Sequence, residues 1–277
     1  MTTIAITGAT GHLGGLTLAA VTARGAQPVA LARSPEKLGG GARAFDYTAP
    51  DVAALAGVDV LVLISSNDFN DRVGQHRRVI EAAKAAGVGR VIYTSILKGE
   101  ASPLRLAQDH IATEAVLKAS GLDHTILRNG WYLENYTENL APVLANGAVI
   151  GSAGAGQISA AARADFAEAI AVTATTPGHE GAVYELAGDV GFTMAEYAAE
   201  VSRQTGRAIP YQDLPQDVYA GILIGAGLPE GFAHILADSD AKAADGALQD
   251  DSRTLSRLIG RPTTPLAQAV TQALAAR

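Results

Sequence analysis

The fold is decided by Gly8-Ala9-Thr10-Gly11-His12-Leu13-Gly14, which follows the strand-like run Ile4–Ile6 and opens a segment with helical spacing. Glycines in such a turn allow a tight bend, close approach of the backbone to a pyrophosphate, and close packing of helix on strand. The helix amino terminus adds N–H donors and the positive end of the helix dipole. A glycine-rich turn alone is a weak signal. Its place at the first strand–helix junction predicts a dinucleotide site formed by this whole stretch.

The first half of the chain alternates short β-branched runs with amphipathic segments, a pattern typical of βαβ units and a parallel sheet. Strands are expected over residues 3–7, 28–32, 43–46, 58–65, 90–95 and 124–128, and helices over residues 12–24, 50–56, 70–86 and 103–120. The sequence therefore predicts an α/β protein with a doubly wound parallel sheet of the Rossmann type. Residues 1–150 are predicted to form its NADP-binding domain.

The alternation weakens after Arg128, and residues 151–277 are predicted to form a smaller, mostly helical lobe on the substrate side. Helices are expected over residues 163–175, 193–206, 216–225 and 265–276, and a strand expected over 183–187 is a candidate to rejoin the main sheet. The acidic residues Asp238, Asp240 and Asp250-Asp251 are expected on solvated loops or at helix amino termini rather than in a carboxylate pair.

Composition excludes several classes of protein. Apolar residues make up 48% of the chain and charged residues 18%, which is typical of a globular protein. The net charge of −7, without a basic cluster, argues against a nucleic-acid partner. Cysteine is absent, so disulfides and thiolate chemistry are excluded, and the histidines lack metal-ligand spacing, so no metal is expected. We also expect no membrane span and a cytoplasmic location, since no leader or long apolar run is present.

Two further features predict how a nucleotide would bind. Arg33 follows the second strand, where NAD-specific sites usually carry an acid, and a guanidinium there pairs with the 2′-phosphate of NADP(H). An ordinary solvated arginine is the alternative. Ser65, Ser66 and Asn67 follow the fourth strand at the carboxyl edge of the sheet. They either contact the cofactor's ribose or pyrophosphate, or they cap the next helix.

The chain resembles the NmrA-like atypical short-chain dehydrogenases, closest to their type 2 NAD(P)H:quinone oxidoreductase branch, with triphenylmethane reductases as near relatives. The resemblance covers essentially the whole chain. Its most specific motif is Leu127-Arg128-Asn129-Gly130-Trp131-Tyr132-Leu133-Glu134-Asn135-Tyr136. The glycine stretch with Arg33 contributes too, as do Gln75-His76-Arg77, Tyr93-Thr94-Ser95, Arg163-Ala164-Asp165, Tyr184-Glu185-Leu186-Ala187-Gly188-Asp189, Ala237-Asp238-Ser239-Asp240 and Leu258-Ile259-Gly260-Arg261-Pro262.

The resemblance implies NADPH as cofactor and a quinone as substrate, and it allows a homo-oligomer. It places the nicotinamide half of the cofactor at Asn129, Gly130, Trp131, Tyr132, Leu133 and Glu134. The aromatic residues Trp131, Tyr132 and Tyr136 would form a platform for the flat substrate. From the residues alone, Asn129 and Gly130 equally fit a turn, and the aromatic residues equally fit core packing.

The chain departs from classical short-chain dehydrogenases, which carry a Tyr-x-x-x-Lys pair for proton transfer. The corresponding positions here read Leu106-Ala107-Gln108-Asp109-His110. His110 is the candidate proton donor, or else a hydrogen-bonding group that does not titrate. Quinone reduction tolerates the missing pair because the cofactor performs the difficult step. Two alternatives remain: an NADP(H)-binding sensor that acts through a protein partner, and a reductase for triphenylmethane dyes or similar xenobiotics.

Overall fold

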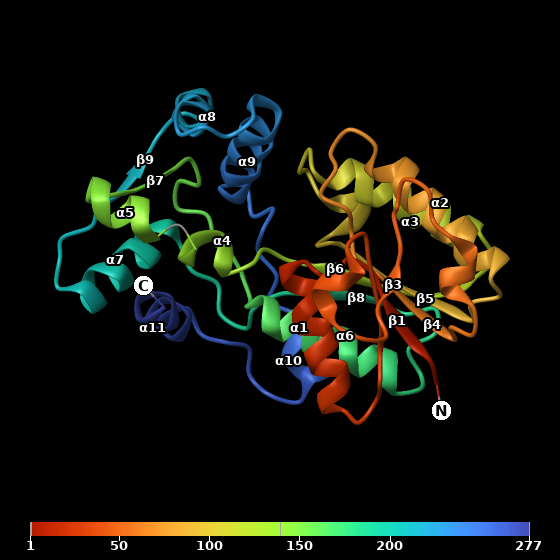
Figure 1. Cartoon of the computed structure of the whole chain (residues 1–277). Helices are drawn as coiled ribbons and strands as arrows, with labels where there is room; N and C mark the ends of the chain where they lie inside the picture. The colour runs from red at the N-terminus through yellow and green to blue at the C-terminus, as the bar shows by residue number, and fades with distance from the viewer. Residues whose placement is uncertain (1, 139, 277) are drawn as a thin grey trace.

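The computed structural model describes residues 2–138 and 140–276. Its central sheet contains seven parallel strands in the order β3-β2-β1-β4-β5-β6-β8 (Figure 1). The order reverses between β1 and β4, which is where open α/β sheets bind ligands. The predicted doubly wound Rossmann fold is confirmed. The strands are β1 (Ile4–Ile6), β2 (Val29–Ala32), β3 (Arg43–Ala44), β4 (Val60–Leu63), β5 (Arg90–Ile96), β6 (Asp123–Asn129) and β8 (Val183–Leu186).

Helices cover both faces of this sheet, which explains why central strands such as β4 are apolar throughout. One face carries α1 (His12–Ala23), α6 (Arg163–Thr175) and α10 (Thr254–Ile259), and the other carries α2 (Arg72–Ala85) and α3 (Ala107–Ala119) (Figure 1). Short 3₁₀ turns lie at η1 (Pro35–Leu38), η2 (Val52–Leu55) and η3 (Gly99–Ala101). The predicted helix over 50–56 is therefore a single 3₁₀ turn.

The remaining elements form a lobe beside the sheet, around a separate hydrophobic cluster (Figure 1). It contains α4 (Glu134–Thr137), α5 (Leu140–Asn146), α7 (Met194–Thr205), α8 (Gln216–Gly225), α9 (Glu230–Ala243), α11 (Leu266–Ala275) and the parallel pair β7 (Val149–Gly151) and β9 (Tyr211–Asp213). Helix α7 begins where the sequence signals it, at a capping box between Thr193 and Glu196. Among the described helices, none has the length and apolar character that a membrane crossing needs.

The packing crosses the predicted boundary at residue 150 in both directions. Strand β8 hydrogen-bonds beside β6, so the strand predicted over 183–187 does rejoin the main sheet. Helix α6 packs on α1, and α10 packs on α6. Conversely, α4 and α5 precede residue 150 but contribute to the cluster of the lobe. The reason is physical: an apolar strand and an apolar helix face are buried wherever a partner surface exists, regardless of their order in the chain.

Candidate functional site

The first strand–helix turn has the geometry of a backbone anion site. Gly8 has φ +61°, and the Gly11 N–H donates to the Gly8 carbonyl oxygen at 2.9 Å. A Cβ on Gly14 would lie 2.1 Å from the same oxygen, so only glycine fits there. Helix α1 has no acidic residue in its first turn, which leaves its positive end free for an anion. Thr10, Gly11 and His12 are exposed, whereas Ala9 and Leu13 are buried beneath the turn.

Arg33 lies directly after β2 and is exposed at the same edge of the sheet. Asp46 has its pKa lowered by backbone and side-chain hydrogen bonds from Thr48 and, to a smaller extent, by the positive charge of Arg33. Lys37 follows on η1 and is also exposed. The sequence motif did not point to this second cation, because Lys37 lies in a turn outside the motif.

Ser66 is held by a network from the first two turns of α2. Its N–H donates to Nε2 of His76 at 2.8 Å, its carbonyl oxygen accepts from Nε of Arg72 at 2.7 Å, and its hydroxyl donates to Oε1 of Gln75 at 2.6 Å. Helix α2 begins at Arg72 with Asp71 at its N-cap position. The segment therefore does not cap α2 but is fixed by it.

The neighbouring residues of that segment are less restrained. The N–H of Ser65 donates to the Thr94 hydroxyl at 2.9 Å, and Asn67 is exposed. The backbone of the segment is thus held in place, and the side chains of Ser65 and Asn67 can contact a ligand at the carboxyl edge of the sheet.

The segment after β6 has a buried polar group without a protein partner. Asn129 is only 4% exposed, and neither polar atom of its carboxamide has a hydrogen-bond partner among the described residues. Burial raises the pKa of Tyr132, and the nearby Asn129 side chain lowers it by a smaller amount, but no hydrogen bond of good geometry satisfies either carboxamide atom of Asn129 among the described residues. Gly130 donates its N–H to the Leu186 carbonyl at 2.7 Å. Since unpaired buried amides are costly, the Asn129 side chain is suited to a ligand.

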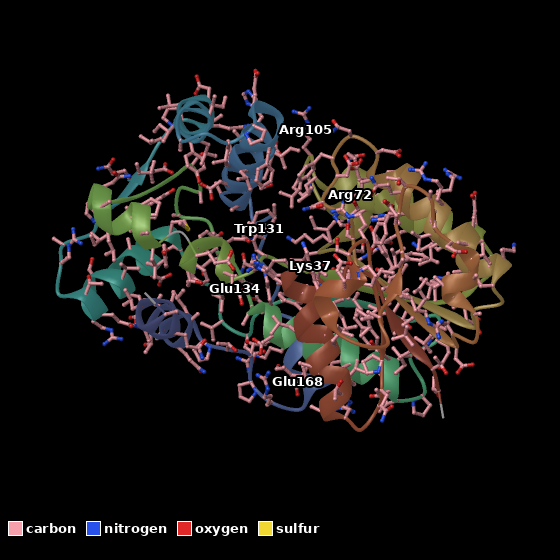
Figure 2. All side chains as sticks on the ribbon, viewed as in Figure 1. Lys37, Arg72, Arg105, Trp131, Glu134 and Glu168 are labelled. Atoms are coloured by element: carbon pink, nitrogen blue, oxygen red, sulfur yellow. The ribbon has the colours of Figure 1, made fainter. Side chains whose placement is uncertain are left out.

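The three predicted platform aromatics do not lie together. Trp131 and Tyr136 line a cavity of about 440 Å³ in the lobe, and Trp131 lies between the lobe and the sheet half (Figure 2). Tyr132 packs instead against Phe166, with ring centroids 5.3 Å apart, and the Arg163 guanidinium lies over its ring. Adjacent residues on an irregular segment point to different sides, which residue spacing alone does not reveal. Leu133 is buried.

A family model described as NAD(P)H-binding matches residues 8–177, the part of the chain that contains the glycine turn, Arg33, Ser66 and Asn129. This chain belongs to the NAD(P)H-binding family. Its similarity to quinone oxidoreductase 2 of Escherichia coli is 49% identity, covering 96% of this chain and 97% of that protein. An NmrA-like family domain-containing oxidoreductase of Aspergillus flavus is 30% identical over 97% of this chain and 94% of that protein.

Two solved structures of reductases with a bound nicotinamide cofactor superpose on nearly the whole chain. The structure of the E. coli NADPH-dependent quinone oxidoreductase QOR2 with NADPH has a TM-score of 0.93 at 47% identity, covering 98% of this chain and 99% of that one. The structure of Citrobacter sp. triphenylmethane reductase with NADP(H) has a TM-score of 0.90 at 33% identity, covering 98% and 99%. The predicted resemblance to NmrA-like short-chain dehydrogenases is confirmed.

Three structural features fit the NAD(P)H cofactor of this family. The glycine turn exposes backbone at the start of helix α1, Arg33 and Lys37 provide positive charge beyond β2, and Asn129 holds a buried amide that has no hydrogen-bond partner among the described residues. These features lie at the carboxyl ends of β1, β2 and β6, along one edge of the sheet.

His110 is buried on α3, with Nδ1 2.9 Å from the Tyr93 hydroxyl oxygen. Burial, and to a lesser extent the nearby positive charge of Arg72, holds the pKa of His110 well below its usual range. Burial and the same Arg72 lower the pKa of His76 to about 3. Both imidazoles are therefore neutral at neutral pH. His110 lacks the extra proton that a general acid delivers, and its geometry favours the non-titrating interpretation.

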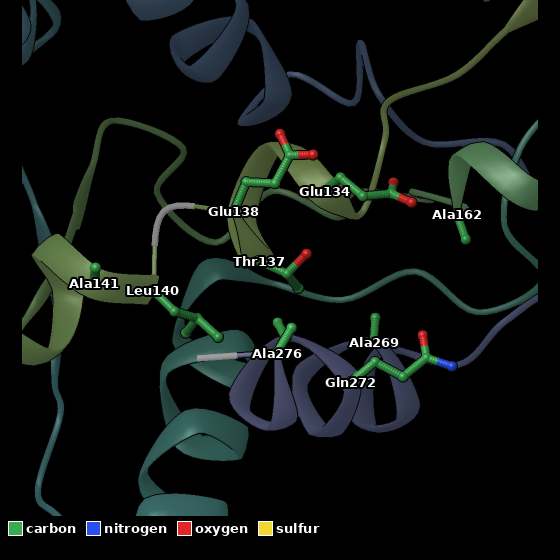
Figure 3. A pocket seen from close by; sticks show the side chains of 10 residues that line it. Glu134, Thr137, Glu138, Leu140, Ala141, Ala162, Ala269, Gln272 and Ala276 are labelled. Carbon is green, nitrogen blue, oxygen red and sulfur yellow. The ribbon is translucent and has the colours of Figure 1, made fainter. Parts of the chain in front are cut away.

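Glu134 is engaged by the protein itself. Both of its carboxylate oxygens lie 3.0 Å from the N–H of Arg163 at the start of α6, and burial raises the pKa of Glu134. Figure 3 shows its carboxylate directed toward Ala162, beside a second cavity of about 370 Å³ between α4 and α11. A carboxylate at a helix amino terminus stabilises that helix. Glu134 thereby ties α4 to α6, across the two halves of the molecule.

Proposed function

We propose that this chain is an NADPH-dependent reductase that transfers hydride to a quinone, in the overall reaction NADPH + H⁺ + quinone → NADP⁺ + hydroquinone. The observation that carries the proposal is the cavity lined by Trp131 and Tyr136. Trp131 comes two residues after Asn129, whose buried amide has no hydrogen-bond partner among the described residues. The near full-length similarity to E. coli quinone oxidoreductase 2 supports the same acceptor class.

The cofactor contacts follow from where the site's polar groups lie. Residues 8–14 receive the pyrophosphate on their exposed backbone, residues 65–67 contact the ribose, and Arg33 with Lys37 pairs with the 2′-phosphate. The Asn129 carboxamide hydrogen-bonds the nicotinamide amide, in the segment that continues to Glu134. Bound NADPH supplies the hydride.

The protein's own contribution to the chemistry is alignment and exclusion of water. Trp131 and Tyr136 hold the flat acceptor, and ring alignment of this kind replaces the missing Tyr-x-x-x-Lys pair. His110 supports Tyr93 from within the core. The proton that completes the reduction comes from solvent, since the buried His110 is neutral.

The test is to mix the purified chain with NADPH and a panel of small quinones, and to follow the absorbance of the reduced cofactor. Turnover well above the uncatalysed rate, with NADPH preferred over NADH, is the expected result. Tight NADP(H) binding without turnover of any quinone would overturn the proposal and favour a nucleotide sensor. Turnover of triphenylmethane dyes but not quinones would favour the dye reductase.

We further propose that the chain acts in the cytoplasm without a nucleic-acid partner, on a small-molecule quinone. Cell fractionation tests the location. Gel-shift titration tests the nucleic-acid statement, and sedimentation velocity measures whether the chain forms a homo-oligomer.

A further inference from the structure

Among the described residues that line the acceptor cavity in the lobe, only Asp240 on α9 carries a carboxyl group. The prediction that Asp240 lies on a solvated loop or at a helix amino terminus was wrong: it lies near the carboxyl end of α9 and lines the cavity. Its Oδ2 accepts a hydrogen bond from the Ser152 N–H, after β7. Apart from Asn135 and Asn146, the other lining residues are apolar or aromatic, and none is Lys, Arg or His.

Asp240 differs from other largely buried carboxylates of the molecule because it has no cationic partner among the described residues. Asp165 lies 2.8 Å from Arg261, and Glu114 lies 2.7 Å from Arg128. Burial and the negative charge of Asp213 raise the pKa of Asp240 to about 6, against the hydrogen bond from Ser152. At pH 7.5 the carboxylate is thus mostly ionised in an apolar cavity and lacks a counter-ion. Such a charge is costly unless something pairs with it.

The titratable groups that face Asp240 supply no positive counter-charge. Asp213 and Tyr211 face it from β9, Tyr136 from α4 and Tyr219 from α8. All of them are neutral or negative. The hydroxyl of Tyr136 is itself buried without a hydrogen-bond partner within the described part of the chain.

The remaining walls have the chemistry that recognises organic cations. Trp131, Tyr136, Tyr197 and Tyr219 all line the cavity that holds Asp240. Aromatic rings attract a cation by their quadrupole, and cages of such rings bind quaternary ammonium groups. A carboxylate in the same cavity adds direct charge pairing.

We propose that this cavity binds acceptors that carry a positively charged, ammonium-type substituent, with Asp240 as the counter-ion that determines this specificity. The inference rests on the proposed function only in calling the ligand an acceptor. The cavity's preference for cations follows from its own residues. In the competing account, Asp240 only tethers the segment after β7 to α9 through Ser152, and no ligand charge is recognised.

The chain itself provides the probe for a binding test, because Trp131 is its one tryptophan and lines the cavity. Benzyltrimethylammonium and its neutral carbon isostere neopentylbenzene are titrated separately into the full chain, without added nucleotide. Tryptophan fluorescence then reports occupancy without any turnover. At pH 7.5 the cation is expected to bind about tenfold more tightly than the isostere, an effect of the size that cation–π contacts and a partly desolvated charge pair produce.

Two variants separate recognition from tethering. Asp240→Asn keeps an acceptor for the Ser152 N–H but removes the charge, so it is expected to reduce the preference for the cation to less than about threefold while the isostere's affinity is unchanged. The matched control is Asp245→Asn, an exposed acid just beyond the same helix, which is expected to keep the full preference. An equal preference in Asp240→Asn and wild type would overturn the inference, as would no preference in the wild type.

The pH dependence gives an independent check. Below pH 6 the Asp240 carboxyl gains its proton, so the wild-type preference for the cation is expected to fall between pH 8 and pH 5, and in Asp240→Asn it should stay flat. Quinone turnover is assayed separately. Absence of turnover with an intact cation preference would remove the proposed function and leave the cation site. Quinone turnover without a preference for the cation would support the proposed function and overturn the cation site.

Discussion

The nucleotide edge of the sheet and the acceptor cavity of the lobe are built in opposite ways. At the nucleotide edge, Asn129 is the exception, and the polar groups beside it are paired by the protein: Ser66 with His76, Arg72 and Gln75, and Tyr93 with His110. In and beside the cavity, the Tyr136 hydroxyl and the Ser152 hydroxyl are buried without partners within the described residues. A paired network makes a rigid frame, whereas unpaired groups in a cavity are available to a ligand.

Gly14 tests the rigid side of this comparison and has the largest expected effect. Gly14→Ala places a Cβ 2.1 Å from the Gly8 carbonyl oxygen, which forces helix α1 away from β1. We expect loss of about 3 kcal/mol or more of unfolding free energy and of NADPH binding, measured by thermal melting and by cofactor titration. The control is Gly15→Ala, whose Cβ would have its nearest contact at 3.9 Å, and which should be neutral or slightly stabilising. Equal melting temperatures for the two variants would contradict the close-approach argument.

Substitutions of Trp131 and His110 compare how much the acceptor cavity and the paired network at the nucleotide edge contribute to catalysis. Trp131→Ala removes a wall of the cavity and misplaces the acceptor, so we expect a larger loss of kcat than in His110→Ala. His110→Ala should lose less than about a hundredfold, because a buried neutral imidazole is not the proton donor. Stopped-flow rates at saturating NADPH, with thermal melts to verify folding, measure both. Complete inactivity of a folded, NADPH-binding His110→Ala variant would show that His110 takes part in proton transfer.

Arg33 tests the nucleotide edge through cofactor choice. If Arg33 pairs with the 2′-phosphate as proposed, Arg33→Asp removes a charge-assisted pair worth roughly 1.5–3 kcal/mol, so NADPH affinity should fall by about one to two decades while NADH affinity changes little. Isothermal titration with both cofactors measures this. Arg77→Asp, an exposed arginine on α2, is the control and should leave the preference intact. Equal wild-type affinities for NADPH and NADH would refute the phosphate contact.

Asp240 tests the cavity through stability, with the smallest expected effect. Its folded-state pKa of about 6 exceeds the ordinary value of 3.8, so its contribution to stability is greatest below pH 3.8 and is lost as the pH rises through 6. Asp240→Asn is always neutral and should therefore be more stable than wild type at pH 8, by about 2 kcal/mol, with little difference at pH 4. Urea unfolding at both pH values measures this. A destabilised variant at pH 8 would mean that the carboxylate is stabilised by the fold.

Sequence alone determined the local features of this protein. The glycine stretch, the β-branched runs and the capping signals specify short-range backbone geometry, and the predicted helix over 163–175 coincides with α6. The predicted end of the second strand also places Arg33 directly after β2. The family resemblance, carried above all by Leu127 through Tyr136, implied NADPH and a quinone.

Only the tertiary structure decided which side chains meet. It turned Tyr132 toward Phe166 and Trp131 toward the lobe, although the two are adjacent in sequence. It buried His110 beside Arg72 and removed its capacity to titrate near neutrality. It also formed α9 and directed Asp240 into an aromatic cavity. The physical reason is that burial, desolvation and charge pairing depend on neighbours that are distant in the chain, whereas backbone propensity is a property of a few consecutive residues.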